Sequence, residues 1–345
     1  MRKIILFLAF TAALMLVTGN LFAQRGARGQ ELEVKLGSPL PRESLWGRTL
    51  DRIAAEWSRV TNGQVRLRII HGGLEGTESK MHLSLSSNSL QAAVYTSFGL
   101  SEIDPGIITM SAPFLIRNER ELDEVMKELQ PVLERRLNAG DYFILAWSKA
   151  GFVNIFSKEP VFTPDDLKRM RIASNPEAEN MNTAFKTMGY QVVEADWQDV
   201  GQKLALPSGG VAAIYNNPAG IAAYQLHKIV GNMCSINIAP VLGGIVMNQL
   251  TWRRIGELNP RYQSELLRVR RQIAQTLDES MQKTVSDAVQ TMTREGLKVN
   301  RPTPAQEQLW FSDVERVTPT LLGTTYDNDL YRRINEVLEK FRKGQ

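Results

Sequence analysis

Two kinds of hydrophobic periodicity alternate along the first third of the chain after an apolar N-terminal run. Period-two alternation, as in Leu32-Glu33-Val34-Lys35-Leu36, is typical of a half-buried strand, and apolar residues at helical spacing between such segments predict amphipathic helices. The predicted elements are strands at 32–36, 65–69 and 90–95 and helices at 46–60 and 77–88. This β-α-β-α-β order predicts an α/β unit with a largely parallel sheet.

The same kind of pattern returns in the middle of the chain. A helix at 122–137 is followed by two strands that could lead into a second unit, and a further strand could return toward the first unit. The predicted elements there are strands at 142–148, 152–157, 171–173, 191–193, 211–215 and 245–247, with helices at 178–188 and 197–206. We therefore expect two α/β lobes, each a β-sheet flanked by helices.

The longest element is predicted near the C-terminus. No glycine or proline occurs from Arg261 to Glu295, and apolar residues keep helical spacing through this stretch. Such a helix would be about 50 Å long at about 1.5 Å per residue, so it should lie across both lobes. A coiled coil is the weaker alternative, because the apolar steps do not hold a strict heptad. A last helix is predicted around 330–341.

These elements predict the domain organisation. Lobe I would comprise 31–148 plus about 243–283, and lobe II 149–242 plus about 284–325, with a C-terminal helix at 326–345. The chain would cross between lobes near 148–151 and 240–244, where we expect hinges. Residues 1–23 read as an export signal, with Arg2 and Lys3 before an apolar core and a cut near Ala23. An uncleaved membrane anchor is the alternative.

Composition narrows the function classes. The 345 residues carry a formal charge of +4, and without Arg2 and Lys3 the 41 basic residues become 39 against 37 acidic ones, or +2. This balance gives no reason to expect a nucleic-acid partner. The single cysteine, Cys234, excludes an internal disulfide, and its apolar neighbours favour a buried structural thiol.

Motifs of catalysis are missing from the sequence. It contains no His-Glu-x-x-His, no Gly-x-Ser-x-Gly and no phosphate-binding glycine pattern, and its three histidines are scattered. We therefore expect neither an enzyme nor a metal site, and no cofactor. Arg171, at a predicted strand, offers a permanently charged planar fork that suits a carboxylate, although a solvated surface arginine is the alternative.

Several strings together resemble the solute-binding proteins of TRAP transporters (tripartite ATP-independent periplasmic, DctP-type). The first, residues 165–172, resembles their "DDLKGLKIR" signature, whose arginine grips the ligand's carboxylate. The others are Pro113-Phe114-Leu115 for "PFL", Asn216-Asn217-Pro218 for a Glu-Asn-Pro-like ligand loop, and Asn248 to Trp252 for "N-x-x-x-W". The resemblance spans roughly 31–322, nearly the whole chain after the leader.

The resemblance implies a two-lobed periplasmic-binding-protein architecture and a transport function. The protein would sit in the periplasm, close its lobes on a small-molecule ligand and deliver it to membrane-embedded permease subunits. The alternative is a structural or signalling protein on the same fold, working through a helical-repeat or membrane partner. Neighbouring genes for a permease would favour transport.

The resemblance also implies a set of ligand-binding residues. Arg171 would anchor a carboxylate with help from Asn217, and Asp199 would orient Arg171 or brace the lobes. Phe152 and Tyr215 neighbour ligand positions of the family, and His71 belongs to a loop expected near the cleft. These six and Val153 are the candidate site residues.

Departures from the family pattern point to an apolar ligand. Val153 stands where many members carry a second ligand-binding arginine, Gly201 replaces a tyrosine, and Ala212-Ala213 replace Asp-Gly. A second carboxylate would lack a charged partner in such a cleft. We therefore expect a hydrophobic monocarboxylate or an amphipathic molecule.

Overall fold

One continuous mixed sheet organises the molecule. The structure, a computed structural model, describes residues 31–176, 178–206 and 210–344. Over these residues the strands are β1 (Leu32–Gly37), β2 (Val65–Ile70), β3 (Ala92–Thr96), β4 (Tyr142–Ser157), β5 (Arg171–Ser174), β6 (Gln191–Glu194), β7 (Ala213–Asn216), β8 (Asn232–Asn248) and β9 (Lys298–Asn300). Their order is β2-β1-β3-β8-β4-β7-β5-β6, with β9 beside β8. The predicted α/β class is confirmed.

Lobe I is the part of the molecule built on β1, β2 and β3, which pair in parallel as the sequence predicts. Its helices are α2 (Leu45–Val60), α3 (Glu78–Ser86), α4 (Ser97–Ile103) and α11 (Gln249–Leu258). Helix α2 begins where the Ser44 hydroxyl accepts a hydrogen bond from the Gly47 amide, and its face buries Leu50 and Trp57 against the sheet.

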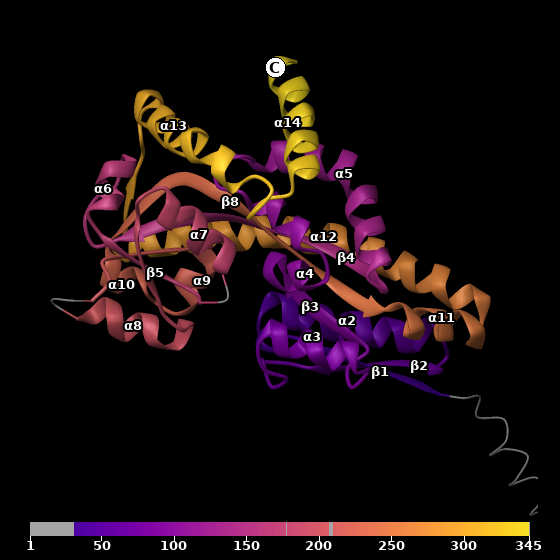
Figure 1. Cartoon of the computed structure of the whole chain (residues 1–345). Helices are drawn as coiled ribbons and strands as arrows, with labels where there is room; N and C mark the ends of the chain where they lie inside the picture. Colours follow the sequence, from indigo (N-terminus) through magenta and orange to yellow (C-terminus); the bar gives the residue numbers. More distant parts are fainter. Residues whose placement is uncertain (1–30, 177, 207–209, 345) are drawn as a thin grey trace, which may run out of the picture.

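Lobe II is built on the parallel strands β5, β6 and β7. Its helices are α6 (Pro164–Lys168), α7 (Glu179–Thr187), α8 (Trp197–Ala205), α9 (Pro218–Ala223) and α10 (His227–Val230). Helix α6 begins with a capping box between Thr163 and Asp166. The two lobes lie side by side along the sheet (Figure 1).

The long antiparallel strands β4 and β8 run through both lobes and join them. The sequence predicts a separate sheet in each lobe, with two strands at 142–148 and 152–157. The structure instead has one strand, β4, whose register against β8 shifts between Lys149 and Phe152. Gly151 lies in this irregular stretch with φ of 78°. Strand β8 starts at Asn232, well before the predicted 245–247, so the lobes share one sheet.

Helix α12 (Pro260–Arg294) has 35 residues and confirms the predicted long helix. Tyr262 and Leu266 near its start pack in the core of lobe I, whereas Met292 near its end packs in the core of lobe II. The helix therefore spans both lobes, as Figure 1 shows.

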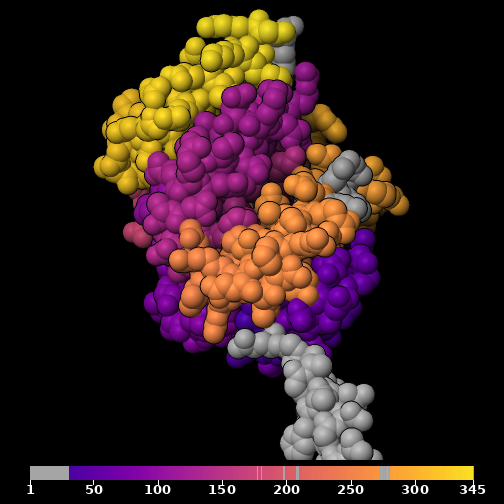
Figure 2. All heavy atoms as spheres, turned by 90° about the vertical axis from the view of Figure 1, so that its right-hand side faces the viewer, coloured from indigo at the N-terminus to yellow at the C-terminus, as the bar shows by residue number. Residues whose placement is uncertain are grey.

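The C-terminal helices lie at the end of the molecule opposite the N-terminal strands of lobe I (Figure 2). Helix α14 (Asn328–Lys343) packs on α5 (Glu119–Ala139) and on the 3-10 helix η1 (Pro105–Ser111). The Arg342 guanidinium binds both carboxylate oxygens of the buried Glu121 at 2.8 and 2.9 Å. Helix α13 (Pro304–Leu321), which the sequence analysis does not predict, packs on α6 and α7.

Cys234 is buried and has no disulfide partner, which confirms the prediction of a structural thiol. None of the helices in the described part of the chain combines the length and apolar character that a bilayer span needs. The predicted export signal at 1–23 lies outside the described residues.

Candidate functional site

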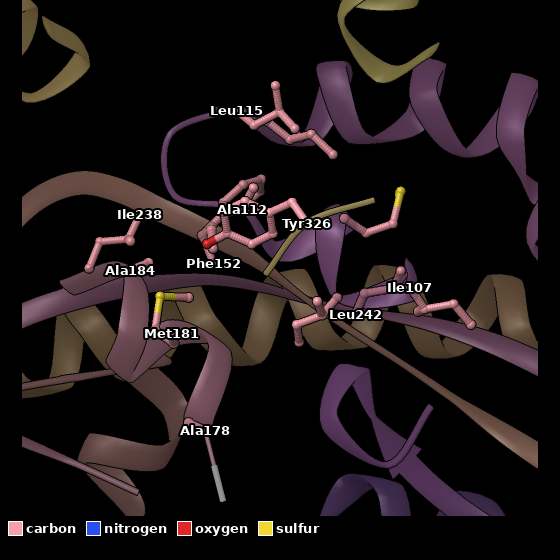
Figure 3. Packing of buried hydrophobic residues seen from close by; sticks show 14 of the residues in the cluster. Ile107, Ala112, Leu115, Phe152, Ala178, Met181, Ala184, Ile238, Leu242 and Tyr326 are labelled. Carbon is pink, nitrogen blue, oxygen red and sulfur yellow. The ribbon is translucent and has the colours of Figure 1, made fainter. Parts of the chain in front are cut away.

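A cavity of about 280 Å³ lies between the two lobes. Lobe I contributes the junction of β3 with α4 and part of η1, lobe II contributes the ends of β5 and β7 with α7 and α8, and β4 and β8 line it where they cross. The lining residues are Thr96, Ser97, Phe98, Ser111, Val153, Ala173, Ser174, Asn175, Ala178, Met181, Val200, Ile214, Tyr215, Asn216, Ala239, Pro240, Val241 and Leu242. Figure 3 shows Met181, Ala178 and Leu242.

The chemistry of this cavity is neutral. Among the described residues that line it, none has a charged side chain. Most of the wall is aliphatic or aromatic, and the polar groups are hydroxyls and amides. A wall of this kind binds a ligand mainly by burying apolar surface, with a few hydrogen bonds to orient it.

On the lobe I side, the polar lining residues include two buried serines. The Ser97 hydroxyl donates to the Leu242 carbonyl oxygen at 3.0 Å and lies 3.0 Å from the Ser111 hydroxyl. Because the Ser97 hydrogen is directed to the carbonyl, Ser111 is the donor of the second bond. This side therefore offers hydroxyl oxygens as acceptors.

On the lobe II side, Tyr215 belongs to a small hydrogen-bonded group. The Ser174 hydroxyl donates to the Asn182 side-chain oxygen, so the Tyr215 hydroxyl, 2.5 Å from Ser174, donates to Ser174. Burial raises the pKa of Tyr215 to about 12, against a lowering by the Ser174 hydrogen bond. The Tyr215 ring packs edge-on against Phe185 at 5.0 Å, which fixes its place in the wall.

Strand β4, one of the two strands that join the lobes, packs closely against lobe II beside the cavity. A Cβ on Gly151 would lie 3.3 Å from both the Asn217 amide nitrogen and the Val285 side chain of α12. The Asn217 side chain donates to the Ala150 carbonyl oxygen and accepts from the Ala219 amide at 2.8 Å, which caps α9. The irregular stretch of β4 is thus tied to the loop of lobe II that carries Asn216 and Asn217.

The structure brings only part of the predicted site together. Val153 and Tyr215 line the cavity. Phe152, the residue before Val153 in β4, is on the opposite face of the strand and belongs to the buried core with Ala112 and Tyr326 (Figure 3). Asn217 does not line the cavity, because its side chain caps α9, whereas its neighbour Asn216 does.

Arg171 is not placed at the cavity. It is the first residue of β5 and exposed, whereas the cavity lies at the other end of that strand, at Ala173, Ser174 and Asn175. Set letter by letter against "DDLKGLKIR", residues 165–173 put Arg171 in the place of the second lysine and Ala173 in the place of the arginine. The expected carboxylate contact of Arg171 therefore has no support in the structure.

His71 and Asp199 also lie away from the cavity lining. The His71 Nε2 atom is 3.0 Å from Asp51 Oδ1, within lobe I. Asp199 is exposed on the first turn of α8 and is not among the described residues that line the cavity. No group of histidine, cysteine, aspartate and glutamate side chains suited to holding a metal ion occurs in the described residues.

The lining residues that sequence reasoning missed share one position in the fold. Thr96, Ser174 and Asn216 end β3, β5 and β7, and Ser97 and Asn175 follow two of these strands directly. Ligands of open α/β sheets bind outside the carboxyl ends of the parallel strands. The small polar residues that end these predicted strands were the available signal.

Two lobes joined by shared strands, with a cavity between them, are an architecture found in ligand-binding receptors. Residues 36–322 match the family model "Bacterial extracellular solute-binding protein, family 7" (DctP), and the chain belongs to this family. The predicted TRAP resemblance is confirmed.

Known relatives agree with this assignment. A solute-binding protein of Sulfitobacter sp. (strain NAS-14.1) is 24% identical over 254 residues, which cover 70% of this chain and 76% of that protein. A TRAP periplasmic solute-binding protein of Ralstonia eutropha, solved with (S)-2-acetolactate, has a TM-score of 0.79 at 19% identity and covers 89% of this chain and 99% of its own. One of Chromohalobacter salexigens, solved with D-glucuronate, has a TM-score of 0.78 at 16% identity with the same two coverages, 89% and 99%.

Proposed function

We propose that this protein is the periplasmic receptor of a TRAP-type secondary transporter, which captures a small molecule between its lobes and delivers it to membrane permease subunits. The observation that carries the proposal is the cavity of about 280 Å³, whose walls come from both lobes and from the strands that join them. A ligand in this position contacts both lobes at once, so it stabilises the closed arrangement over an open one.

The ligand is small and mostly apolar. Liquid water occupies roughly 30 Å³ per molecule, so the cavity holds a ligand on the order of ten heavy atoms. Met181, Val200, Ile214 and Leu242 supply apolar surface on several sides. The relatives solved with (S)-2-acetolactate and D-glucuronate bind chemically different acids, so likeness to them supports the receptor role and leaves the ligand to be argued from this cavity.

Export supports the same role. A receptor of this kind works outside the cytoplasmic membrane, and the N-terminal sequence provides Arg2 and Lys3 before an apolar run that ends near Ala23. We propose cleavage there, which leaves the two-lobed protein free to move between ligand and permease. Sequencing the N-terminus of protein taken from cells tests this step, and a chain that still begins at Met1 would mean an anchored receptor.

The central experiment measures whether a small molecule is held between the lobes. Protein purified without denaturation is unfolded, and the released molecules are identified by mass spectrometry. The identified molecule is added back and followed by calorimetry and small-angle scattering. We expect binding together with a smaller radius of gyration.

Val153→Trp fills the cavity from β4 and should weaken binding by at least about tenfold. Leu250→Trp, on the surface of α11 where Leu250 is 53% exposed, is the matched control and should bind normally. Equal binding by both variants would place the ligand elsewhere and contradict the proposal.

A further inference from the structure

We infer that the ligand is an uncharged molecule and that this cleft is built to reject carboxylates. The inference rests on the proposed receptor function and narrows the ligand class, because the sequence resemblance by itself implies a bound acid. Three observations support it: the wall of the cavity, the carboxylate held beside the start of α4, and the carboxylates of a neighbouring hollow.

The first observation is the wall. Ala173 occupies the place that an arginine takes in the signature string, and Ala173 is part of the cavity lining. Val153 lines the wall from β4, where many members of the family carry a second arginine. Arg171 is exposed at the far end of β5. A carboxylate in this cavity would therefore lose water without gaining a cationic partner.

The second observation is the start of α4, whose first residues line the cavity. The Glu78 carboxylate is held there, with its oxygens 3.1 Å from the Thr96 amide, 3.0 Å from the Thr96 hydroxyl and 2.7 Å from the Gly99 amide. An acidic side chain fixed beside the lining disfavours a second carboxylate in the cavity.

The third observation is a second hollow beside the cavity. A hollow of about 200 Å³ shares Phe98 with the main cavity, and three carboxylates line it. Glu78 and Glu102 come from lobe I, and Glu179 comes from the start of α7 in lobe II. Carboxylates on both sides of a cleft make its potential negative, which lowers the local concentration of anions.

The remaining polar groups suit a neutral ligand. The Ser111 and Tyr215 hydroxyls donate to other residues of the protein and keep acceptor lone pairs for a ligand. The amides of Asn175 and Asn216 lie on the same wall. An amide, alcohol or ketone on an apolar skeleton matches this set, because it can exchange one or two hydrogen bonds without bringing a charge.

Because the charge of an acidic ligand depends on pH, the pH dependence of ligand affinity tests the inference. A carboxylic acid could enter this cavity only in its protonated form, so its affinity would fall about tenfold for each pH unit above its pKa. An acid held by a cationic group would bind equally between pH 6 and 8, since it is ionised throughout. A neutral ligand also binds with equal affinity between pH 6 and 8. Chemical identification of the released molecule distinguishes it from an acid held by a cationic group.

The experiment uses the full mature protein and three probes with one skeleton: isovaleramide, isovalerate and isopentylamine. Thermal shift and calorimetry compare them at pH 6, 7 and 8, together with the molecule released from natively purified protein. We expect the released molecule to lack an acidic group, and isovaleramide to stabilise the protein more than either charged probe.

Two variants at one position separate charge from size. Ala173→Arg should bind isovalerate at least about tenfold more tightly than the wild type does, whereas Ala173→Met, with a neutral chain in the same place, should not. A released acid whose affinity is equal at pH 6 and 8, or isovalerate or isopentylamine binding better than isovaleramide, would overturn the inference and leave the receptor function standing. A folded protein that releases no molecule and is stabilised by no probe would overturn both.

Discussion

Gly151 offers a sharp test of how the crossing strands are tied to lobe II. Its φ is 78°, a conformation that costs a residue with a Cβ about 1–2 kcal/mol. A Cβ there would also lie 3.3 Å from Asn217 and from Val285, closer than ordinary van der Waals contact. Gly151→Ala should therefore lower the free energy of unfolding by about 1–2 kcal/mol for the backbone conformation and by about 1 kcal/mol more for the close packing.

Gly63 is the matched control, because its φ is also 78° and nothing lies within 4 Å of a Cβ placed on it. Gly63→Ala should lower the free energy of unfolding by about 1–2 kcal/mol, for the backbone conformation alone. Urea unfolding followed by circular dichroism measures both variants, and the comparison is valid where the slope m is unchanged. We expect Gly151→Ala to unfold at a lower urea concentration than Gly63→Ala.

Ligand affinity provides a second difference between the two glycine variants. A shifted Asn217 disturbs the loop that carries Asn216 into the cavity, so Gly151→Ala should also bind the released ligand a few-fold more weakly, whereas Gly63→Ala binds it normally. Equal stability and equal affinity of the two variants would refute the reasoning, since it would mean that the crossing region makes no tight contact with lobe II.

Three further predictions address other parts of the molecule. Arg171→Ala should leave ligand affinity within about twofold of the wild type, since Arg171 is exposed at the end of β5 away from the cavity; a loss of tenfold or more in calorimetry would return it to the ligand site. Arg342→Met should destabilise the protein by about 1–3 kcal/mol in urea, because it leaves the buried Glu121 carboxylate without its bidentate partner, and an unchanged midpoint would show that water replaces the arginine. Burial raises the pKa of Cys234 to about 11, so at pH 8 only about one thiol in a thousand is ionised, and a thiol-specific disulfide reagent should react with it only after unfolding. Fast reaction of the native protein would contradict the buried thiol.

The elements that depend on neighbouring residues could be read from the sequence. Alternation predicts β1 and β2, and the absence of glycine and proline after Pro260 predicts α12 almost to its observed ends. The start of α13 also had a local signal, a capping box between Thr303 and Gln306, which the sequence reasoning did not use. Local signals of this kind act within a few residues, so one sequence is enough to recognise them.

The strands that join the lobes could not be read in the same way. Strand β8 continues through Pro240 and the glycines at 243 and 244, residues that usually interrupt a strand. Its pairing with β3 on one side and β4 on the other carries it through these positions. Partners far apart in the sequence therefore make one sheet where the local pattern indicates two.

By itself, the sequence determined the α/β class, the long helix and the membership of a solute-binding family, because each depends on local spacing or on motifs in order. Only the tertiary structure decided which side chains meet the ligand. Strand alternation puts Arg171 and Ala173 on one face of β5, but the cavity forms only at the Ala173 end, where residues of β4, β7 and β8 complete its wall. Whether the site contains a charged residue depends on which end of β5 borders the cavity, and elements distant in sequence determine that.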